Sequence, residues 1–218
     1  MKPELLAYLQ SLLTSRRRAL FAKVLDQRTR HFTVVTEDVY QMHNTSAVMR
    51  SCDVFGIQDL HVIEARFGKR VDKEIAMGAQ KWVDIHRHSN AEDCLQQLRA
   101  SGYQIVATTP HQGVPLNEFD VTKKSALLFG TEKKGLSPEL LAQADVALTI
   151  PMYGFTESLN ISVSAAIILN ELVGRMRREG APWALSAEGR YALECAWTVA
   201  SIKDAPRIIE RYIQENDL

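Results

Sequence analysis

The sequence predicts an α/β protein in which helices flank a mostly parallel sheet, with short helical extensions at both ends. Two observations favour this class. Short β-branched or apolar runs, each long enough for one buried strand, alternate with segments of helical period. Gly and Pro also stand where the helices of such a pattern should end. Alternating strands and helices are typical of a parallel sheet, because parallel strands need a crossover connection that is usually helical.

The composition is that of an ordinary globular protein. The 218 residues are 46% hydrophobic and 24% charged, with 26 basic and 26 acidic residues and no net charge. A nucleic-acid-binding protein of this kind must therefore use local basic clusters. We expect no metal site, because Cys52, Cys94 and Cys195 are scattered without zinc-site or redox spacing. No apolar run approaches the ~20 residues of a membrane span and no signal peptide is evident, so we expect a soluble, cytoplasmic protein.

Residues 1–30 form the predicted N-terminal basic helical extension. Pro3 suits a first helical turn, and the leucines that follow recur at helical spacing. The segment Ser15–His31 then carries six basic residues against the single acid Asp26. A solvated helix face is the alternative to an RNA-binding role for this cluster. The candidate RNA-binding residues are Arg16, Arg17, Arg18, Arg28 and Arg30.

The first half of the central domain, which we predict to span residues 31–178, begins with a β-branched run. Its expected elements, in order, are a strand at His31–Thr36, a helix at Thr45–Phe55 with Asn44 as N-cap and Gly56 after its end, a strand at Leu60–Ala65, and an exposed loop with some helix over 66–81.

The second half continues the alternation and is followed by a C-terminal helical extension over residues 179–218. Its expected elements are a helix that opens with the capping box Ser89–Glu92 and closes near Gly102, strands at Tyr103–Thr108, Ser125–Phe129 and Val146–Ile150, a short helix started by Ser137 and Pro138, a long buried helix at Ser158–Arg178, and two short helices separated around Asp204–Pro206.

Three loops are candidates for a binding site, because ligands of open α/β sheets bind beyond the carboxyl ends of the strands. They are Met42–Asn44, Phe129–Gly135 and Ile150–Asn160. No P-loop and no G-x-G-x-x-G motif occurs, so a nucleotide triphosphate or dinucleotide has little support. Ser158 and Asn160 lie where a helix N-terminus collects unpaired N–H groups, and simple capping is the alternative to a site role for them.

Three segments in this order resemble the signature motifs of the SPOUT-class RNA 2'-O-methyltransferases, close to the tRNA guanosine-2'-O-methyltransferase (TrmH) family. They are Asn44–Asp53, Leu128–Ser137, and Ile150–Met152 continued by Ser158–Ser164. The resemblance covers roughly residues 30–178. It implies a deep C-terminal trefoil knot, S-adenosylmethionine bound in a bent shape within that knot, and a homodimer built across it. The knot breaks the usual rule against threaded chains, so periodicity does not predict it.

The resemblance also implies roles for individual residues. Arg50 matches the family's catalytic arginine and Asn44 the asparagine that supports it, while Glu132, Ser158 and Asn160 match polar residues of the other two motifs. The implied cofactor-binding residues are Thr109, Gly130, Ile150, Pro151, Met152 and Leu159. Met42 stands where many relatives have proline, and the segment 153–157 departs from the common bacterial version.

The implied reaction is methyl transfer from a sulfonium to a ribose 2'-hydroxyl, so the protein must align the groups and help to remove a proton. Arg50 is either the general base or a charged clamp on a neighbouring phosphate, because deprotonating a free arginine at neutral pH costs about 9 kcal/mol. The short helical ends resemble enzymes that act on guanosine 18 of the tRNA D-loop. Ribosomal RNA as substrate and a non-catalytic RNA-binding module are the alternatives; neither DNA nor a membrane is expected as a partner.

Overall fold

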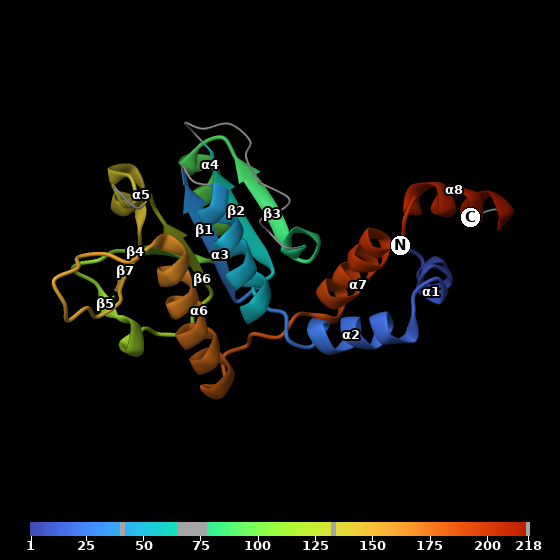
Figure 1. The fold of residues 1–218 in the computed structure, drawn as a ribbon, viewed down its shortest axis with the longest axis horizontal. Coiled ribbons are helices and arrows are strands. Elements are labelled where there is room, and N and C mark those ends of the chain that lie inside the picture. Colours follow the sequence, from blue (N-terminus) through green and yellow to red (C-terminus); the bar gives the residue numbers. More distant parts are fainter. Residues whose placement is uncertain (40–41, 65–77, 132–133, 217–218) are drawn as a thin grey trace. The chain divides into compact units, whose positions relative to one another are not determined.

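The computed structural model describes residues 1–39, 42–64, 78–131 and 134–216. The chain forms two compact units (Figure 1): residues 29–183 make the larger one, and residues 1–28 together with 184–218 make the smaller one. No helix in the described part of the chain combines the length and the apolar character needed to cross a bilayer.

A parallel sheet is the centre of the larger unit. Within the described residues its strands are β1 (Phe32–Glu37), β2 (Asp59–Ile63), β3 (Asp84–His88), β4 (Gln104–Thr108), β5 (Val114–Pro115), β6 (Ser125–Phe129) and β7 (Val146–Thr149). Their order across the sheet is β3-β2-β1-β6-β4-β7-β5, and every pair of neighbours is parallel. All residues of β1, β2 and β6 are buried, as expected for central strands covered on both faces.

Helices cover both faces of this sheet (Figure 1). They are α3 (Met42–Phe55), α4 (Ala91–Ala100), α5 (Pro138–Gln143) and α6 (Ile161–Arg178), with single 3-10 turns at Ala79–Lys81 and Leu116–Glu118. The alternation of side chains along each strand divides the core in two. Val34 and Leu127 point into the cluster that contains α3 and α6, whereas Val35 and Leu128 point into the cluster that contains α4 and α5.

Local sequence signals explain where several helices begin and end. Ser137 caps α5 by accepting a hydrogen bond from the backbone N–H of Leu140, with Pro138 in the first turn. Gly56 and Gly102 follow α3 and α4 with positive φ angles of 78° and 80°, a conformation that glycine adopts without a Cβ penalty.

The smaller unit contains four helices in its described residues: α1 (Pro3–Ser11), α2 (Ser15–Leu25), α7 (Ala187–Ser201) and α8 (Ala205–Glu215). Helix α7 packs against α1 and α2. Phe21 meets Trp197 edge to face at 5.7 Å between ring centroids, and the Gln10 side chain donates to Glu194 at 2.8 Å. The predicted break around Asp204 is confirmed, and this residue has a positive φ of 56° just before α8.

Some predicted boundaries are wrong. Helix α3 begins at Met42, so Asn44 lies inside the helix and is not its N-cap. Helix α4 is capped by Asn90 and not by Ser89, and α6 begins at Ile161 because Asn160 is its cap. Strands β3 and β5 were not predicted, since β3 is polar and β5 has only two residues. Most of the predicted loop 66–81 lies outside the described residues.

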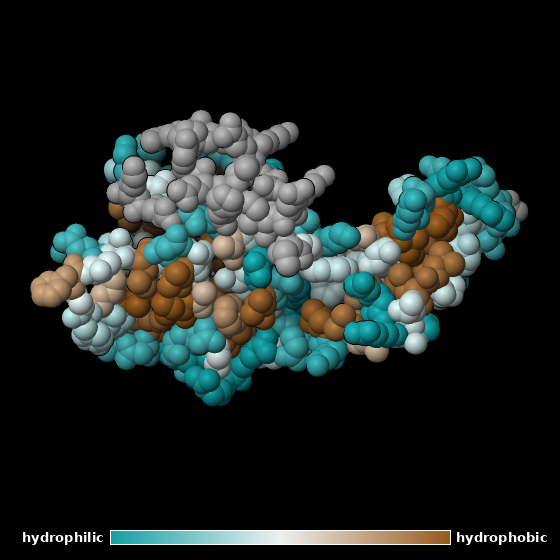
Figure 2. All heavy atoms as spheres, in the orientation of Figure 1, coloured by the Kyte–Doolittle hydropathy of each residue, from teal (hydrophilic) through white to brown (hydrophobic). Residues whose placement is uncertain are grey.

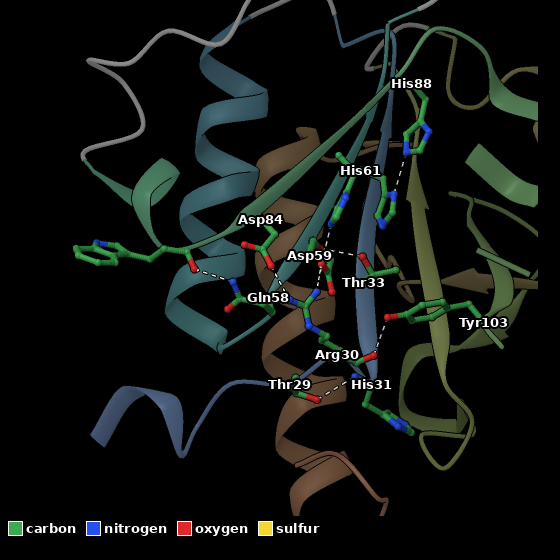
Figure 3. Close-up of polar contacts among 12 residues, drawn as sticks. Thr29, Arg30, His31, Thr33, Gln58, Asp59, His61, Asp84, His88 and Tyr103 are labelled. Carbon is green, nitrogen blue, oxygen red and sulfur yellow. Dashed lines mark hydrogen bonds and ion pairs between the residues drawn. The ribbon is translucent and has the colours of Figure 1, made fainter. Parts of the chain in front are cut away.

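A charged network joins the amino ends of the first three strands (Figure 3). Asp59 and Asp84 are partners in the β2–β3 register, and the Arg30 guanidinium pairs with both carboxylates. Burial of Asp59 by itself favours the neutral acid, but a 2.8 Å hydrogen bond from His86 and the charge of Arg30 outweigh it. They hold the pKa of this carboxyl below its usual 3.8.

We expect Asp59→Asn to lower the free energy of unfolding by about 2–3 kcal/mol. Removing one member of a buried pair typically costs ~3–5 kcal/mol, and the value is smaller here because the Arg30 side chain is 37% exposed. Urea unfolding at neutral pH measures the effect. Glu215→Gln, which breaks the exposed pair with Arg211, is the control and should leave stability almost unchanged. Equal stability of Asp59→Asn and wild type would contradict a structural role of the network.

Candidate functional site

Loops that follow three neighbouring strands surround a cavity of about 510 Å³ at the carboxyl edge of the sheet. Its volume lies within the usual range of small-molecule sites. The lining residues come from the ends of β4, β6 and β7, from the loops after them, and from the first half of α6. Those used below are Thr109, His111, Gly130, Lys134, Leu148, Ile150, Met152, Glu157, Ser158, Leu159 and Ser164.

The loop after β6 turns tightly at the cavity wall. The backbones of Thr131 and Gly135 exchange two hydrogen bonds of 2.9 and 2.8 Å, and Gly135 has a positive φ of 66°. A Cβ built on Gly130 would lie 2.0 Å from the carbonyl carbon of Gly135. This position therefore accepts glycine alone, because the two backbone segments occupy the space that a side chain would need.

The loop after β4 is fixed to the neighbouring strand. The backbone N–H of Thr109 donates to the carbonyl of Leu148 at 2.9 Å, and the Thr109 hydroxyl donates to the carbonyl of His111 at 2.7 Å. Gly113 passes close to β7, where an added Cβ would lie 2.9 Å from the backbone of Ala147. The hydrogen bond from Thr109 and the close approach of Gly113 thus hold this side of the cavity against β7.

The loop after β7 leads into α6 and connects it with α3. Asn160 caps α6 by accepting from the backbone N–H of Ser162 at 2.8 Å. Its side-chain amide also donates to the Asn44 side chain at 3.3 Å, across 116 residues of sequence. The capping interpretation of Asn160 is thus confirmed, and the same side chain additionally ties the first candidate loop to the third.

The cavity suits a ligand with both an apolar and a polar part. Leu148, Ile150, Met152 and Leu159 offer apolar surface, while backbone amides of the tight turns and polar side chains such as Ser158 lie among them. Few charges reach the cavity, Lys134 and Glu157 being exceptions among its described lining residues. Binding there can therefore rest on shape and on backbone hydrogen bonds.

The cavity brings together every predicted cofactor-binding residue except Pro151, which is exposed beside it. Ser158 lines it as well. Asn44 is buried and lies with Asn160 at the start of α6, whereas Arg50 is exposed on α3 and does not line the cavity. Glu132 lies outside the described residues. The individual roles of these residues remain predictions.

The predicted RNA-binding arginines separate into two groups. Arg16, Arg17 and Arg18 are exposed at the start of α2 and can reach a phosphate. Arg28 is only 1% exposed and lies 5.2 Å over the ring of Trp197, so its prediction is wrong: a buried guanidinium does not meet RNA. Arg30 is half-buried and its guanidinium is paired with two carboxylates at the strand starts, so its RNA-binding role stays a prediction.

Two sets of residues were not predicted from the sequence. Lys134, Glu157 and Ser164 line the cavity, but only the fold shows that they share one wall. His61, His88 and Cys94 gather on the α4 side of the sheet and could ligate a metal ion. The alternation His86-Arg87-His88 was the available signal for the second set, since side chains two apart in a strand share a face.

Comparison with known proteins gives consistent matches. Residues 31–170 match the SpoU rRNA Methylase family. The chain is 37% identical over 179 residues to a tRNA (guanosine(18)-2'-O)-methyltransferase of Borreliella burgdorferi, and the match covers 82% of each chain. Among solved structures, the A. aeolicus TrmH/SpoU tRNA modifying enzyme is similar with a TM-score of 0.77 and 34% identity, over 86% of this chain and 98% of that one. The SpoU methyltransferase AviRb of Streptomyces viridochromogenes in complex with AdoMet has a TM-score of 0.62 and 28% identity, over 70% of this chain and 63% of that one.

We expect Gly130→Ala to weaken S-adenosylmethionine binding by about 10- to 100-fold. The new methyl group overlaps the Gly135 backbone, and overpacking of this kind costs ~1–3 kcal/mol. Isothermal titration calorimetry measures the affinity. Gly154→Ala, in the neighbouring loop, is the matched control, because no atom lies within 4 Å of its added Cβ. Full affinity in Gly130→Ala would show that this turn does not shape the binding cavity.

Proposed function

This chain belongs to the SpoU family of RNA methylases, and we propose that it methylates the ribose 2'-hydroxyl of guanosine 18 in the tRNA D-loop, with S-adenosylmethionine as methyl donor. The observation that carries the proposal is the cavity at the carboxyl ends of β4, β6 and β7, which gathers the residues that the family resemblance assigns to the donor. The relative with 37% identity carries the name of this tRNA activity, which favours tRNA over ribosomal RNA.

The residues present fit the methyl donor. Its sulfonium-bound methyl group is already activated, so the chain must bind and orient the donor without having to activate it. Gly130 lets the Gly135 backbone pack closely at the cavity wall, and Ile150, Met152 and Leu159 provide an apolar wall for the adenine ring. We propose residues 31–178 as the methyltransferase domain, with the C-terminal part knotted around this cavity.

Arg50 is the group that we propose to act on the RNA. Its side chain is exposed on α3, and an arginine in water remains charged. We therefore favour the clamp over the general base: the guanidinium binds the phosphate next to the target ribose and orients the 2'-hydroxyl toward the methyl group. Asn44, which is buried and bonded to Asn160, positions α3 relative to the start of α6.

A second copy of the chain is the proposed partner of α6. Val163 and Ile167 are spaced by four residues in α6 and are 45% and 39% exposed, so they form an apolar stripe on one face at the start of the helix. Figure 2 shows hydrophobic side chains over the N-terminal part of α6. Aligned apolar residues of this kind mark an interface more than isolated ones do. We propose a homodimer across this stripe, located in the cytoplasm with its tRNA substrate.

The experiment that tests the activity is methyl transfer from labelled S-adenosylmethionine to separated tRNA and ribosomal RNA, followed by mapping of the modified nucleotide. We expect label at the 2'-oxygen of guanosine 18 in tRNA. Methyl on a base, label on ribosomal RNA alone, or no transfer to either RNA would reject the proposal.

We expect Arg50→Lys to reduce kcat by at least ~100-fold while S-adenosylmethionine affinity stays within ~3-fold of wild type. Lysine keeps the charge but loses the planar fork that holds a phosphate in a fixed orientation. Single-turnover methyl transfer and calorimetry separate the two effects. Arg178→Lys is the matched control, because Arg178 is an exposed arginine at the C-terminal end of α6. Near-normal turnover in Arg50→Lys would remove this residue from the mechanism.

We expect the triple substitution of Arg16, Arg17 and Arg18 by alanine to weaken tRNA binding and to flatten its salt dependence. Each phosphate contact contributes roughly 0.7–0.9 to the slope of log K against log salt, so the slope should decrease by up to about 2–3. Filter binding over a salt series measures it. Arg99 and Arg178 replaced together by alanine control for a general loss of charge. An unchanged slope in the triple variant would show that these arginines do not bind phosphates and form only a solvated helix face.

We expect Ile167→Glu to convert the dimer into monomers, because a carboxylate would have to be buried in the interface without a partner. Sedimentation velocity at micromolar concentration reports the change. Leu20→Glu, at a residue of α2 that is 48% exposed, is the control and should leave the assembly intact. A wild-type protein that sediments as a monomer would already exclude the dimer.

A further inference from the structure

A histidine- and cysteine-containing cluster lies outside the cavity, on the α4 side of the sheet. His61 comes from β2, His88 from the end of β3 and Cys94 from the beginning of α4. The candidate ligand atoms of these three residues all lie within 4.8 Å of one another. Figure 3 shows the rings of His61 and His88 directed toward each other, joined by a 2.9 Å hydrogen bond between Nδ1 of His61 and Nε2 of His88.

The fold itself creates this convergence. In the parallel register His61 is opposite His86 and Ile63 is opposite His88, so His61 and His88 are diagonal neighbours on one face. Helix α4 covers this face, and Cys94 belongs to the same buried cluster as Ile63. Three separate elements thus direct two imidazoles and one thiol to one point.

We propose that His61, His88 and Cys94 form a binding site for one divalent transition-metal ion of the Zn²⁺ class. Two imidazole nitrogens and a thiolate are the ligand types that such ions prefer. Metal–nitrogen bonds of ~2.0–2.1 Å and a metal–sulfur bond of ~2.3 Å require tetrahedral ligand atoms to be roughly 3.3–3.6 Å apart. The nitrogens, now 2.9 Å apart, must separate by a few tenths of an ångström, and the sulfur, which lies within 4.8 Å of both, must approach by no more than about 1.2 Å.

The protonation states agree with ligation by the two imidazoles. Burial and the neighbouring histidines lower the pKa of His61 to about 4 and also lower that of His88, so both rings are neutral at pH 7. A neutral imidazole has one N–H and one lone pair, so the ring that donates in the hydrogen bond between them must move that proton to its other nitrogen before both rings can ligate. Burial raises the pKa of the Cys94 thiol to about 12. Formation of the metal–sulfur bond therefore displaces the thiol proton, which leaves to solvent; no oxidant or reductant is needed.

The ion would stabilise the position of the edge strand β3. Strand β3 has β2 as its sole neighbour among the described strands, and an ion held by His61, His88 and Cys94 would cross-link β3 to both β2 and α4. His88 is half-buried, so water can reach the ion and fill its fourth position. His86 is a neighbouring histidine that we do not propose as a ligand and that therefore serves as an internal control. Its ring stacks on that of His61 at 4.5 Å between centroids, but its Nε2 is hydrogen-bonded to Asp59.

The test is titration of the full-length, reduced chain with Co²⁺ alone and then with Zn²⁺ as competitor. We expect one Co²⁺ per chain, a thiolate-to-cobalt charge-transfer band in the near ultraviolet, and loss of that band when Zn²⁺ is added. Cys94→Ser should abolish the band, and both Cys94→Ser and His88→Asn should weaken Zn²⁺ binding by more than ~100-fold. His86→Asn should change the Zn²⁺ affinity by less than ~10-fold, because His86 is not one of the proposed ligands. Even the loss of a residue that hydrogen-bonds to a metal ligand typically costs ~10- to 100-fold.

Cys52→Ser and Cys195→Ser are matched controls at two other buried cysteines and should retain the band. Circular dichroism verifies that each variant is folded. If Cys94→Ser does not fold, the test is alkylation of the wild-type chain, in which bound Zn²⁺ should protect Cys94 from the reagent. Absence of Co²⁺ binding at micromolar concentration, binding without a thiolate band, or a band that survives in Cys94→Ser would overturn the proposal. None of these outcomes bears on methyl transfer to tRNA, which is measured independently.

Discussion

Parallel pairing of β4, β6 and β7 is the constraint on which the site depends. Because these neighbours run in one direction, the loops after them emerge at the same edge of the sheet, although they are far apart in sequence. The tight turn between Thr131 and Gly135 and the bond from Thr109 to Leu148 then fix two of these loops to the strands. The cavity is therefore a consequence of strand direction combined with glycine at a position that has no space for a side chain.

The two ends of the sheet serve different purposes. At the amino ends of β1, β2 and β3, the guanidinium of Arg30 pairs with the carboxylates of both Asp59 and Asp84, a network that we expect to stabilise this end of the sheet. At the carboxyl ends of β4, β6 and β7, backbone amides and apolar side chains remain available to a ligand. Arg30, although close in sequence to the basic cluster of α2, thus has ion-pair partners at the strand starts.

The elements found from the sequence are those with a strong local signal. Ser125–Phe129 was predicted with its observed bounds because five apolar or small residues form a fully buried strand between polar segments. Strand β3 escaped prediction because Asp84, His86 and His88 give it a polar face that resembles a loop. The start of α3 was misplaced for a similar reason: Asn44 has the residue type of a cap, but it lies within the helix, and its side chain bonds to Asn160.

By itself, the sequence determined the α/β class, the loops that could bind a ligand, and the family, because each of these depends on periodicity or on short motifs read along the chain. Only the tertiary structure decided which motif residues meet. It places Thr109, Gly130, Ile150, Met152 and Leu159 around one cavity, leaves Arg50 on the surface, and buries Arg28 against Trp197. It also unites His61, His88 and Cys94, since strand register and helix packing fix contacts between residues whose separation in sequence carries no information about their distance in space.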